Sequence, residues 1–328
     1  MPAAVGMTTR IEFNRSKLSE SLSVLARAGV FVGTSSWKYP GWIDQLYTRA
    51  RYERQGKLDE RRFKSDCLQE YAEVFKTVGV DSTYYTFPGQ SMIFQLSQAV
   101  PDDFLFAFKV TGDITIKKFS KQTRFGQRAG EVNKHFLDAE LFESTFLKPI
   151  QAFRDRAGLL MFEFSKFYPS DYARGRDFLT DLGRFFGALP KGWPYGVEIR
   201  NTNFLQPEYF SLLREHGIAH VYNNWSAMPT VGEQMAMEGS VTNPRLCGAR
   251  FLLTPGRKYQ EAVDTFAPYA EVQKVDPEAR AAGGKLLAEG AGASGRRTLV
   301  FVNNRLEGNA LGTVAAMVEE AGRAARPS

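Results

Sequence analysis

Eight short apolar segments rich in β-branched and aromatic residues recur along the chain, and each is separated from the next by enough residues for a helix. Apolar segments of this length are typical of strands that are buried on both faces of a parallel sheet. The predicted strands cover residues 31–35, 78–84, 104–110, 159–164, 195–199, 218–222, 247–252 and 298–302.

Between these segments, apolar residues return every three or four positions, which predicts amphipathic helices. The stretches that begin at Cys67 and Glu140 show this spacing, and two others end at Pro190 and Gly217, which are common helix stop signals. A last helix is expected over 310–325. Strands that alternate with helices eight times predict an α/β fold, a single TIM-like (β/α)8 barrel with parallel strands.

The length of the chain, 328 residues, suits one such barrel, and no shift in composition marks a domain boundary. We therefore expect a single domain over 1–328. Within it, the barrel occupies 31–315, and residues 1–30 form an N-terminal extension with a helix at 17–28. The Ala- and Gly-rich stretch 274–297 is expected to be a helix followed by a surface loop.

Functional groups of a TIM barrel lie at the carboxyl ends of its strands, and strand side chains alternate between the inside and the outside. If the polar end residues face inward, five strands repeat a small residue followed two positions later by a polar one. These pairs are Gly33/Ser35, Gly79/Asp81, Ala107/Lys109, Gly196/Glu198 and Gly248/Arg250. The small residues leave space for long polar side chains or a ligand, so the pattern predicts a polar barrel mouth.

Three acids and three bases are expected at that mouth. They are Asp81, Glu163, Glu198, Lys109, Arg200 and Arg250. Ionised groups are costly to bury unless they are paired. The set therefore favours a ligand site in which Glu198, Lys109 and Glu163 are the candidate catalytic residues. The alternative interpretation is a structural salt-bridge network that holds the end of the barrel together.

The first predicted strand is followed by WKYPGW, which places Trp37, Tyr39 and Trp42 at the same end of the barrel. Aromatic faces stack well on sugar or base rings, so we interpret this loop as a wall of the ligand site; the alternative is a hydrophobic plug over the barrel. The other candidate ligand-binding residues are Ser35, Asp81, Thr83, Tyr84, Tyr85, Arg200, Asn224, Arg250, Asn303 and Asn304.

The net charge of +6 is concentrated near the N-terminus, where residues 1–64 hold 12 Lys and Arg against 6 Asp and Glu, whereas the remainder holds 30 of each. Most of the excess lies in the basic segment 49–64. Such a segment can bind nucleic acid, but Glu53, Asp59 and Glu60 interrupt it, which favours a solvated segment of mixed charge. Nucleic acid is therefore the less favoured partner, and a small-molecule ligand, anionic or sugar-like, is the favoured one.

The sequence has no apolar run long enough to cross a membrane, and its first 15 residues lack the apolar core of a secretory signal. We therefore expect a cytoplasmic protein with no membrane partner. Cys67 and Cys247 are expected to be reduced and buried.

Three histidines, His135, His216 and His220, are too few for a His-rich metal centre, and His220 is expected to be a hydrogen-bonded core residue. A magnesium or manganese site made of carboxylates is disfavoured by the neighbouring cations. The sequence also lacks a phosphate-binding glycine loop. We predict no metal and no cofactor.

Five motifs follow one another along the chain: GTSSWKYPGW, STYYTFP, FAFKV, GVEIR and VFVNNRLEGNA. On these motifs the chain resembles the YecE-like domain-of-unknown-function family, number 72, from about residue 33 to residue 315. The resemblance implies a TIM-barrel-like fold, in agreement with the strand count, and it implies no particular activity.

The chain departs from the family pattern at several positions, each of which changes the chemistry of the barrel mouth. Gly79 stands for an acid, Asp81 for an amide, Ile116 for a histidine, Glu163 for a glutamine, and Asn223 or Asn224 for an aspartate. The segment 49–64 is also longer than usual.

We predict an enzyme with acid–base chemistry of the hydrolase or lyase type. Glu198 would act as general acid or base, Lys109 and Arg200 would hold negative charge, and Asn303 and Asn304 would orient the substrate. The alternative is a non-catalytic protein that binds a ligand or nucleic acid through the aromatic residues at the mouth and the basic segment 49–64.

Overall fold

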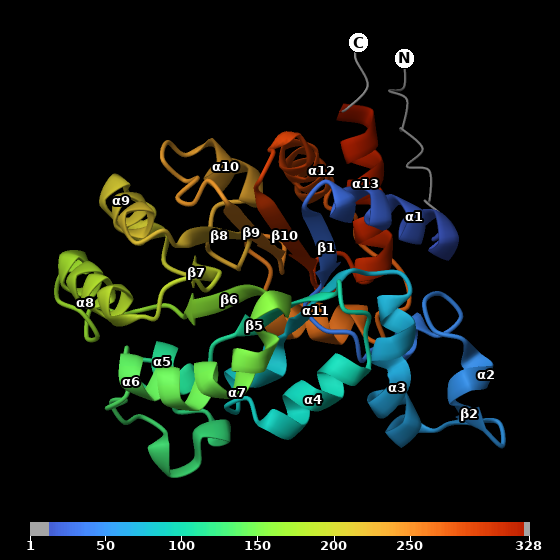
Figure 1. Cartoon of the computed structure of the whole chain (residues 1–328), viewed down its shortest axis with the longest axis horizontal. Helices are drawn as coiled ribbons and strands as arrows, with labels where there is room; N and C mark the ends of the chain where they lie inside the picture. The colour runs from blue at the N-terminus through green and yellow to red at the C-terminus, as the bar shows by residue number, and fades with distance from the viewer. Residues whose placement is uncertain (1–12, 325–328) are drawn as a thin grey trace.

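The computed structural model describes residues 13–324, and among them eight parallel strands form one barrel-shaped sheet (Figure 1). Each of the eight predicted strands corresponds to one of these, which confirms the predicted TIM-like barrel. In sheet order the strands are β1 (Val30–Thr34), β10 (Arg297–Val302), β9 (Leu246–Phe251), β8 (Ala219–Asn223), β7 (Tyr195–Ile199), β6 (Ala157–Phe164), β5 (Leu105–Lys109) and β4 (Thr77–Val80).

β1 and β4 lie at the two ends of this hydrogen-bonded order, and a side chain bridges them. The Tyr71 hydroxyl, on α3 (Glu60–Ala72), donates to the Thr77 carbonyl oxygen at 3.1 Å and accepts from the Thr34 amide at 3.0 Å. Gly33 permits the close approach of the two strands, because a Cβ atom there would collide with the Thr77 carbonyl oxygen. Tyr71 therefore closes the barrel along the seam between β1 and β4.

Helices surround the sheet, and Figure 1 shows α1 and α13 side by side near β1 and β10. The longer ones are α1 (Arg15–Arg27), α3, α4 (Gln90–Gln98), α8 (Gly175–Ala188), α9 (Pro207–Glu215), α10 (Val231–Ala236), α11 (Tyr259–Phe266), α12 (Pro277–Gly292) and α13 (Ala310–Ala324). The helices expected at 17–28, before Pro190, before Gly217, within 274–297 and near the C-terminus are thereby confirmed, and residue 325 lies outside the described part of the chain. Shorter elements are α2 (Arg49–Tyr52), the hairpin β2 (Glu53–Arg54) and β3 (Lys57–Leu58), α5 (Gly112–Thr115), α6 (Ala139–Leu141) and α7 (Lys148–Ile150).

Two predicted elements are wrong in their extent. The strand predicted over 78–84 ends at Val80, and η2 (Asp81–Tyr84) is a 3₁₀ turn. The helix predicted from Glu140 is broken into α6, the π-helical η4 (Phe142–Leu147), α7 and the 3₁₀ turn η5 (Gln151–Arg156). The interruption falls around Pro149, which has no amide hydrogen to continue a helical ladder.

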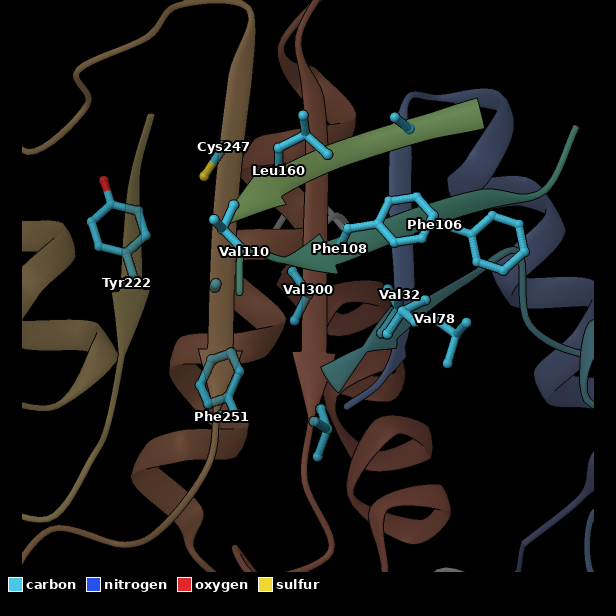
Figure 2. Packing of buried hydrophobic residues seen from close by; sticks show 14 of the residues in the cluster. Val32, Val78, Phe106, Phe108, Val110, Leu160, Tyr222, Cys247, Phe251 and Val300 are labelled. Atoms are coloured by element: carbon cyan, nitrogen blue, oxygen red, sulfur yellow. The ribbon is translucent and has the colours of Figure 1, made fainter. Parts of the chain in front are cut away.

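Apolar side chains pack in two layers, one on each face of the sheet. An inner cluster fills the barrel and consists of Ala107, Leu159, Met161, Ala219, Val221, Leu246, Leu299 and Phe301. A larger outer cluster lies between the strands and the helices, and Figure 2 shows part of it, including Val32, Phe106, Phe108 and Val300. Ala107, between Phe106 and Phe108, belongs to the inner cluster, so the alternation assumed from the sequence is confirmed on β5.

The small residues below the mouth do not leave open space. A Cβ atom at Gly196 would lie 2.8 Å from Leu159 Cδ1 and 2.9 Å from Val221 Cγ2. The same two side chains also cover Gly248. Leu159 and Val221 therefore fill the volume beside these two glycines.

Cys67 and Cys247 are free and buried, as predicted. None of the helices in the described residues has the length and apolar character needed to span a membrane. The prediction that the first 15 residues are not a secretory signal falls largely on residues 1–12, which lie outside the described residues.

Candidate functional site

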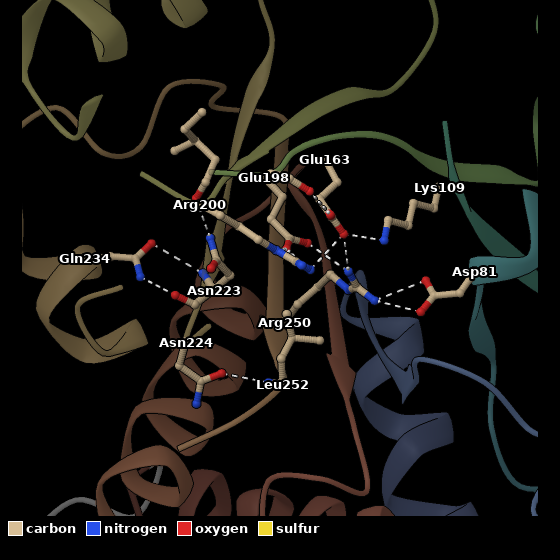
Figure 3. Close-up of polar contacts among 12 residues, drawn as sticks. Asp81, Lys109, Glu163, Glu198, Arg200, Asn223, Asn224, Gln234, Arg250 and Leu252 are labelled. Carbon is tan, nitrogen blue, oxygen red and sulfur yellow. Dashed lines mark hydrogen bonds and ion pairs between the residues drawn. The ribbon is translucent and has the colours of Figure 1, made fainter. Parts of the chain in front are cut away.

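All six charged residues predicted for the barrel mouth come together at the carboxyl ends of the strands (Figure 3). Lys109 ends β5, Glu163 and Glu198 lie near the ends of β6 and β7, and Arg250 lies near the end of β9. Asp81 reaches the group from η2 rather than from β4. We call these residues, together with Arg200, the mouth cluster.

The two glutamates of the cluster occupy paired register positions on neighbouring strands. Arg200 follows β7 and turns back over both of them. Its Nη2 lies 2.7 Å from Glu163 Oε2 and 2.8 Å from Glu198 Oε1. One guanidinium therefore offsets the repulsion between two adjacent carboxylates.

Arg250 links the glutamates to Asp81. Its Nη1 lies 2.9 Å from Glu198 Oε2, and its Nη2 lies 3.0 Å from both carboxylate oxygens of Asp81. The same guanidinium is 3.8 Å from Glu163. Arg250 is buried and lies close to all three acids, so it is the central cation of the cluster.

Aromatic rings cover the other two cations of the cluster, Lys109 and Arg200. Lys109 forms an ion pair with Glu163, and its Nζ lies 3.8 Å from the centre of the Tyr84 ring. The guanidinium carbon of Arg200 lies 4.0 Å from the centre of the Trp225 ring. Both cations therefore combine an ion pair with a cation–π contact, which fixes their position.

Burial and charge act in opposite directions on Glu198. Its burial favours the neutral acid, but Arg200, Arg250 and Lys109 outweigh that effect and lower its pKa from 4.5 to about 2. Burial also opposes the charge on Arg200 and Arg250, yet the facing carboxylates raise both guanidinium pKa values above their ordinary value. The cluster is therefore fully ionised near neutral pH at Glu198, Arg200 and Arg250, and each of its three carboxylates faces a cation.

Four of the predicted polar ligand-binding residues hydrogen-bond through their side chains to the backbone around the mouth, and Ser35 does not. Thr83 Oγ1 donates to the Lys109 carbonyl oxygen at 2.7 Å, and Asn224 Oδ1 accepts from the Leu252 amide at 2.7 Å. Asn303 Oδ1 accepts from the Arg305 amide at 3.0 Å, and Asn304 Oδ1 accepts from the Ala310 amide at 2.7 Å. The Ser35 amide donates to the Val302 carbonyl oxygen at 3.1 Å, whereas the Ser35 hydroxyl is buried without a hydrogen-bond partner among the described residues.

The three aromatic rings of the loop after β1, WKYPGW, pack into or against the core. Trp42 is fully buried and its ring stacks on Tyr47 at 6.3 Å between centres, and Trp37 is also buried. Tyr39 packs on Trp42 at 4.8 Å, and burial raises its pKa to about 12. Trp37 and Trp42 both belong to the outer apolar cluster, between the strands and the helices.

Tyr85 differs from these rings because 65% of its surface is exposed. It lies edge-on to Tyr84 at 5.4 Å between ring centres. Tyr84, which is buried beneath Lys109, and Tyr85 therefore remain beside the mouth cluster, as predicted.

His220 is a hydrogen-bonded core residue, as predicted. Its Nε2 lies 3.3 Å from Gln234 Oε1, and its Nδ1 lies 3.3 Å from the Tyr209 hydroxyl. A carbonyl oxygen can only accept, so Nε2 carries the proton and the Tyr209 hydroxyl donates to Nδ1. Burial lowers the His220 pKa from 6.5 to about 4, which keeps the ring neutral.

The sequence-based prediction of the site did not include two aromatic residues near the mouth. Trp225 stacks on Arg200, and Tyr259 lies 4.5 Å from the Arg305 guanidinium. Trp225 directly follows Asn224 at the end of β8, so its place after a strand was a usable signal. Tyr259 begins α11, and nothing in the local pattern points from that helix to the mouth.

Most cations of the basic segment 49–64 lie beside carboxylates. Arg49 pairs with Asp44, Lys64 lies 2.8 Å from Glu60, and Arg62 lies 3.7 Å from Asp66. The segment folds into α2, the β2–β3 hairpin and the start of α3. This arrangement agrees with the expectation of a solvated segment of mixed charge.

The chain is similar to the UPF0759 protein YecE of Escherichia coli strain K12 and to its counterpart in Escherichia coli O157:H7. It is 24% identical to each over 176 residues, which is 53% of this chain and 50% of the relative. The match therefore spans about half the length of these curated relatives.

Two solved structures of DUF72 family proteins share the fold. One, from Enterococcus faecalis V583, is 17% identical with a TM-score of 0.59, and the match covers 89% of this chain and 97% of that one. The other, from Thermotoga maritima MSB8, is 19% identical with a TM-score of 0.57, and the match covers 90% and 99%. The family model described as "Protein of unknown function DUF72" matches residues 31–328, so the chain belongs to the DUF72 family.

Proposed function

We propose that the mouth cluster is the active site of an enzyme that performs acid–base chemistry on a small, anionic, sugar-like substrate. The observation that carries this proposal is the convergence of three acidic and three basic side chains at the carboxyl end of a TIM-like barrel, with two glutamates in adjacent register positions. Burying this much charge is costly. At the end of the barrel where such folds bind their substrates, that cost is better explained by chemistry than by stability.

The proposed roles of the carboxylates follow from how far solvent reaches each of them. Asp81 is the carboxylate that solvent reaches, because 31% of its side chain is exposed, whereas Glu198 is fully buried. Glu198, with its pKa near 2, holds Arg200 and Arg250 in place and does not take up a proton near neutral pH. The general base of this proposal is therefore Asp81, and Glu198 is a positioning residue.

The cations at the same edge would receive the negative charge of the substrate. Lys109 and Arg200 retain 9% and 12% of their side-chain surface, respectively. Both are held by carboxylates and aromatic rings, so they are positioned before a ligand arrives. Tyr85 and Trp225 beside them offer faces on which a sugar ring can stack.

Binding tests the site before any reaction is known. We would measure the affinity for glucose 6-phosphate and glucuronate by calorimetry, with glucose as the uncharged control. Lys109→Gln should weaken binding of both anions at least tenfold, and Lys121→Gln, which changes an exposed lysine with no ion pair in the described residues, should leave it unchanged. Equal affinity of the Lys109→Gln variant and the wild type would overturn the proposed anion site.

Turnover separates an enzyme from a binding protein. Once one of the anions is seen to bind, its conversion by the wild type is followed by NMR. Asp81→Asn should keep the affinity within a few-fold and abolish conversion. Tight binding without conversion by the wild type would favour the non-catalytic alternative.

A further inference from the structure

A second concave surface lies at the opposite end of the barrel from the mouth cluster. It encloses about 1270 Å³ and is lined by the segments that lead into β1, β6, β7, β8, β9 and β10. Phe31, Ala157 and Leu246, from the amino ends of three strands, are among its lining residues. We call this surface the basal basin.

The basal basin carries a strong positive charge. Six of its lining residues are basic and one, Asp155, is acidic. The basic residues are Arg27, Arg154, Lys191, Arg245, Arg296 and Arg297. No ion pair joins any of the six to a carboxylate of residues 13–324, whereas every cation of the mouth cluster has one.

Arg297 points toward the barrel axis at the bottom of the basin. It lies two residues before Leu299, which belongs to the inner cluster, and its register partner on β9 is Leu246, of the same cluster. Side chains two residues apart on a strand share a face, so Arg297 faces inward. Within the described chain its half-buried guanidinium makes no hydrogen bond or ion pair.

Two further arginines are held in place around the basin. Arg154 Nη2 donates to the carbonyl oxygens of Lys191 and Gly192 at 3.2 and 3.0 Å, and its guanidinium lies 5.3 Å from the Trp193 ring. Arg296 Nη2 donates to the Glu289 carbonyl oxygen at 3.2 Å, while its buried Nε has no partner among the described residues. Carbonyl oxygens fix these guanidinium groups without neutralising them.

We propose that the basal basin is a second binding site, for a compact anion that carries several phosphate groups, such as a nucleoside triphosphate. Six cations against one acid match a ligand with three or more negative charges, and guanidinium groups bind phosphate oxygens in pairs. The cations approach from several sides of a bowl rather than along one stripe. This shape suits a compact ligand better than an extended nucleic-acid strand, and the apolar lining residues suit its ring.

The site is separate from the mouth cluster and does not depend on the proposed activity. The inner cluster lies between the two ends of the barrel, and Arg297 and Arg250 lie at opposite ends of neighbouring strands. A ligand in the basal basin would therefore bind without touching Asp81, Lys109 or Arg200.

Inorganic tripolyphosphate is the probe for this proposal. Calorimetry at 150 mM salt should show one site per chain. Arg297→Gln should weaken binding at least tenfold, and the double variant Arg245→Gln/Arg297→Gln at least a hundredfold. The control is Arg54→Gln/Lys57→Gln on the β2–β3 hairpin, which removes the same number of positive charges elsewhere and should change the affinity less than twofold.

The outcomes that overturn the proposal are distinct. Equal weakening in the hairpin control would mean that only net charge matters. An unchanged affinity in Arg297→Gln would place the anion elsewhere. A 20-nucleotide single strand that binds in an Arg297-dependent way when tripolyphosphate does not would assign the basin to nucleic acid. If Arg297→Gln does not fold, the single variant Arg245→Gln replaces it, because Arg245 is exposed. A several-fold loss of affinity for tripolyphosphate in that variant supports the site, and an unchanged affinity overturns it.

Discussion

Glu163 and Glu198 sit side by side in register on β6 and β7, and the Nη2 atom of one arginine lies within 2.8 Å of a carboxylate oxygen of each. Two adjacent buried carboxylates repel each other unless cations lie between or beside them. Arg200, which follows β7, and Arg250, which lies on β9, supply these cations. The stability of the barrel mouth therefore depends on charge balance rather than on any single ion pair.

Glu198→Gln should destabilise the protein by about 3–5 kcal/mol, because it leaves Arg200 and Arg250 buried with one negative charge fewer. Chemical denaturation followed by circular dichroism measures the loss. Glu215→Gln, which changes an exposed glutamate on α9, is the control and should shift stability by less than 0.5 kcal/mol, as is typical of surface substitutions. Similar losses for the two variants would show that the cluster contributes no more than a surface charge.

Lowering the pH should remove the contribution of ionised Glu198 to the free energy of unfolding. Its pKa is about 2 in the folded protein and 4.5 in the unfolded chain, so the unfolded chain takes up the proton first as the pH falls. The contribution is complete above about pH 4.5 and is lost as the pH drops toward 2. Glu198→Gln should therefore show a shallower loss of stability than the wild type in this window.

His220 should produce a second acid-sensitive window at higher pH. Its pKa falls from 6.5 to about 4 on folding, so protonation again favours the unfolded chain. Stability should decline as the pH is lowered from about 6.5 to 4, by about 3 kcal/mol in all. His220→Gln cannot titrate, and its stability should stay flatter over this range in denaturation series at fixed pH. Parallel curves for variant and wild type would contradict the assignment.

Tyr71→Phe should weaken the seam between β1 and β4. It removes the hydroxyl that donates to the Thr77 carbonyl oxygen and accepts from the Thr34 amide, at a cost of about 1–3 kcal/mol. Hydrogen exchange of the Thr34 amide should speed up more than that of amides within the β6–β7 ladder. Tyr195→Phe, which removes a hydroxyl that donates to the Pro190 carbonyl oxygen, is the matched control and should not affect Thr34.

Gly196→Ala and Gly187→Ala should shift stability in opposite directions. A methyl group at Gly196 meets Leu159 and Val221 below 3 Å, and overpacking of this kind costs about 1–3 kcal/mol. Gly187 lies exposed in α8, where the nearest atom to an added Cβ is 3.9 Å away. Alanine there should stabilise the helix by about 0.5–1 kcal/mol. A Gly196→Ala variant as stable as the wild type would show that the barrel interior can accommodate an added methyl group without strain.

The fold was predictable because each strand is a short apolar run whose two faces are both buried. Strand side chains alternate between the two faces of a sheet, so the sequence also indicates which of them face the barrel interior. This alternation placed Lys109, Glu163, Glu198 and Arg250 at the carboxyl end of the barrel before their contacts were known. The prediction that Asp81 lies on a strand is wrong for a local reason. Residues 78–84 read as one β-prone run, but the chain turns after Val80, so Asp81 reaches Arg250 from a 3₁₀ turn.

The packing of Trp42 could not be predicted from its own loop. It is buried because Tyr47 stacks on it, and Tyr47 in turn packs against Tyr52 and Phe63 on later elements. The stacking of Trp225 on Arg200 likewise joins residues that follow two different strands. Contacts of this kind arise from tertiary packing, on which the local pattern carries no information.

The pairing of β1 with β10 sets the order in which the barrel can be completed during synthesis. Among the eight barrel strands of the described residues, β1 is synthesised first, and its ladder partner β10 is synthesised last. Until then the Tyr71 bridge from α3, together with the direct packing of the two strands, can hold β1 beside β4. One edge of β1 therefore stays unpaired during most of the synthesis of the chain. The barrel closes late, and before it closes the nascent chain is most exposed to mispairing and aggregation.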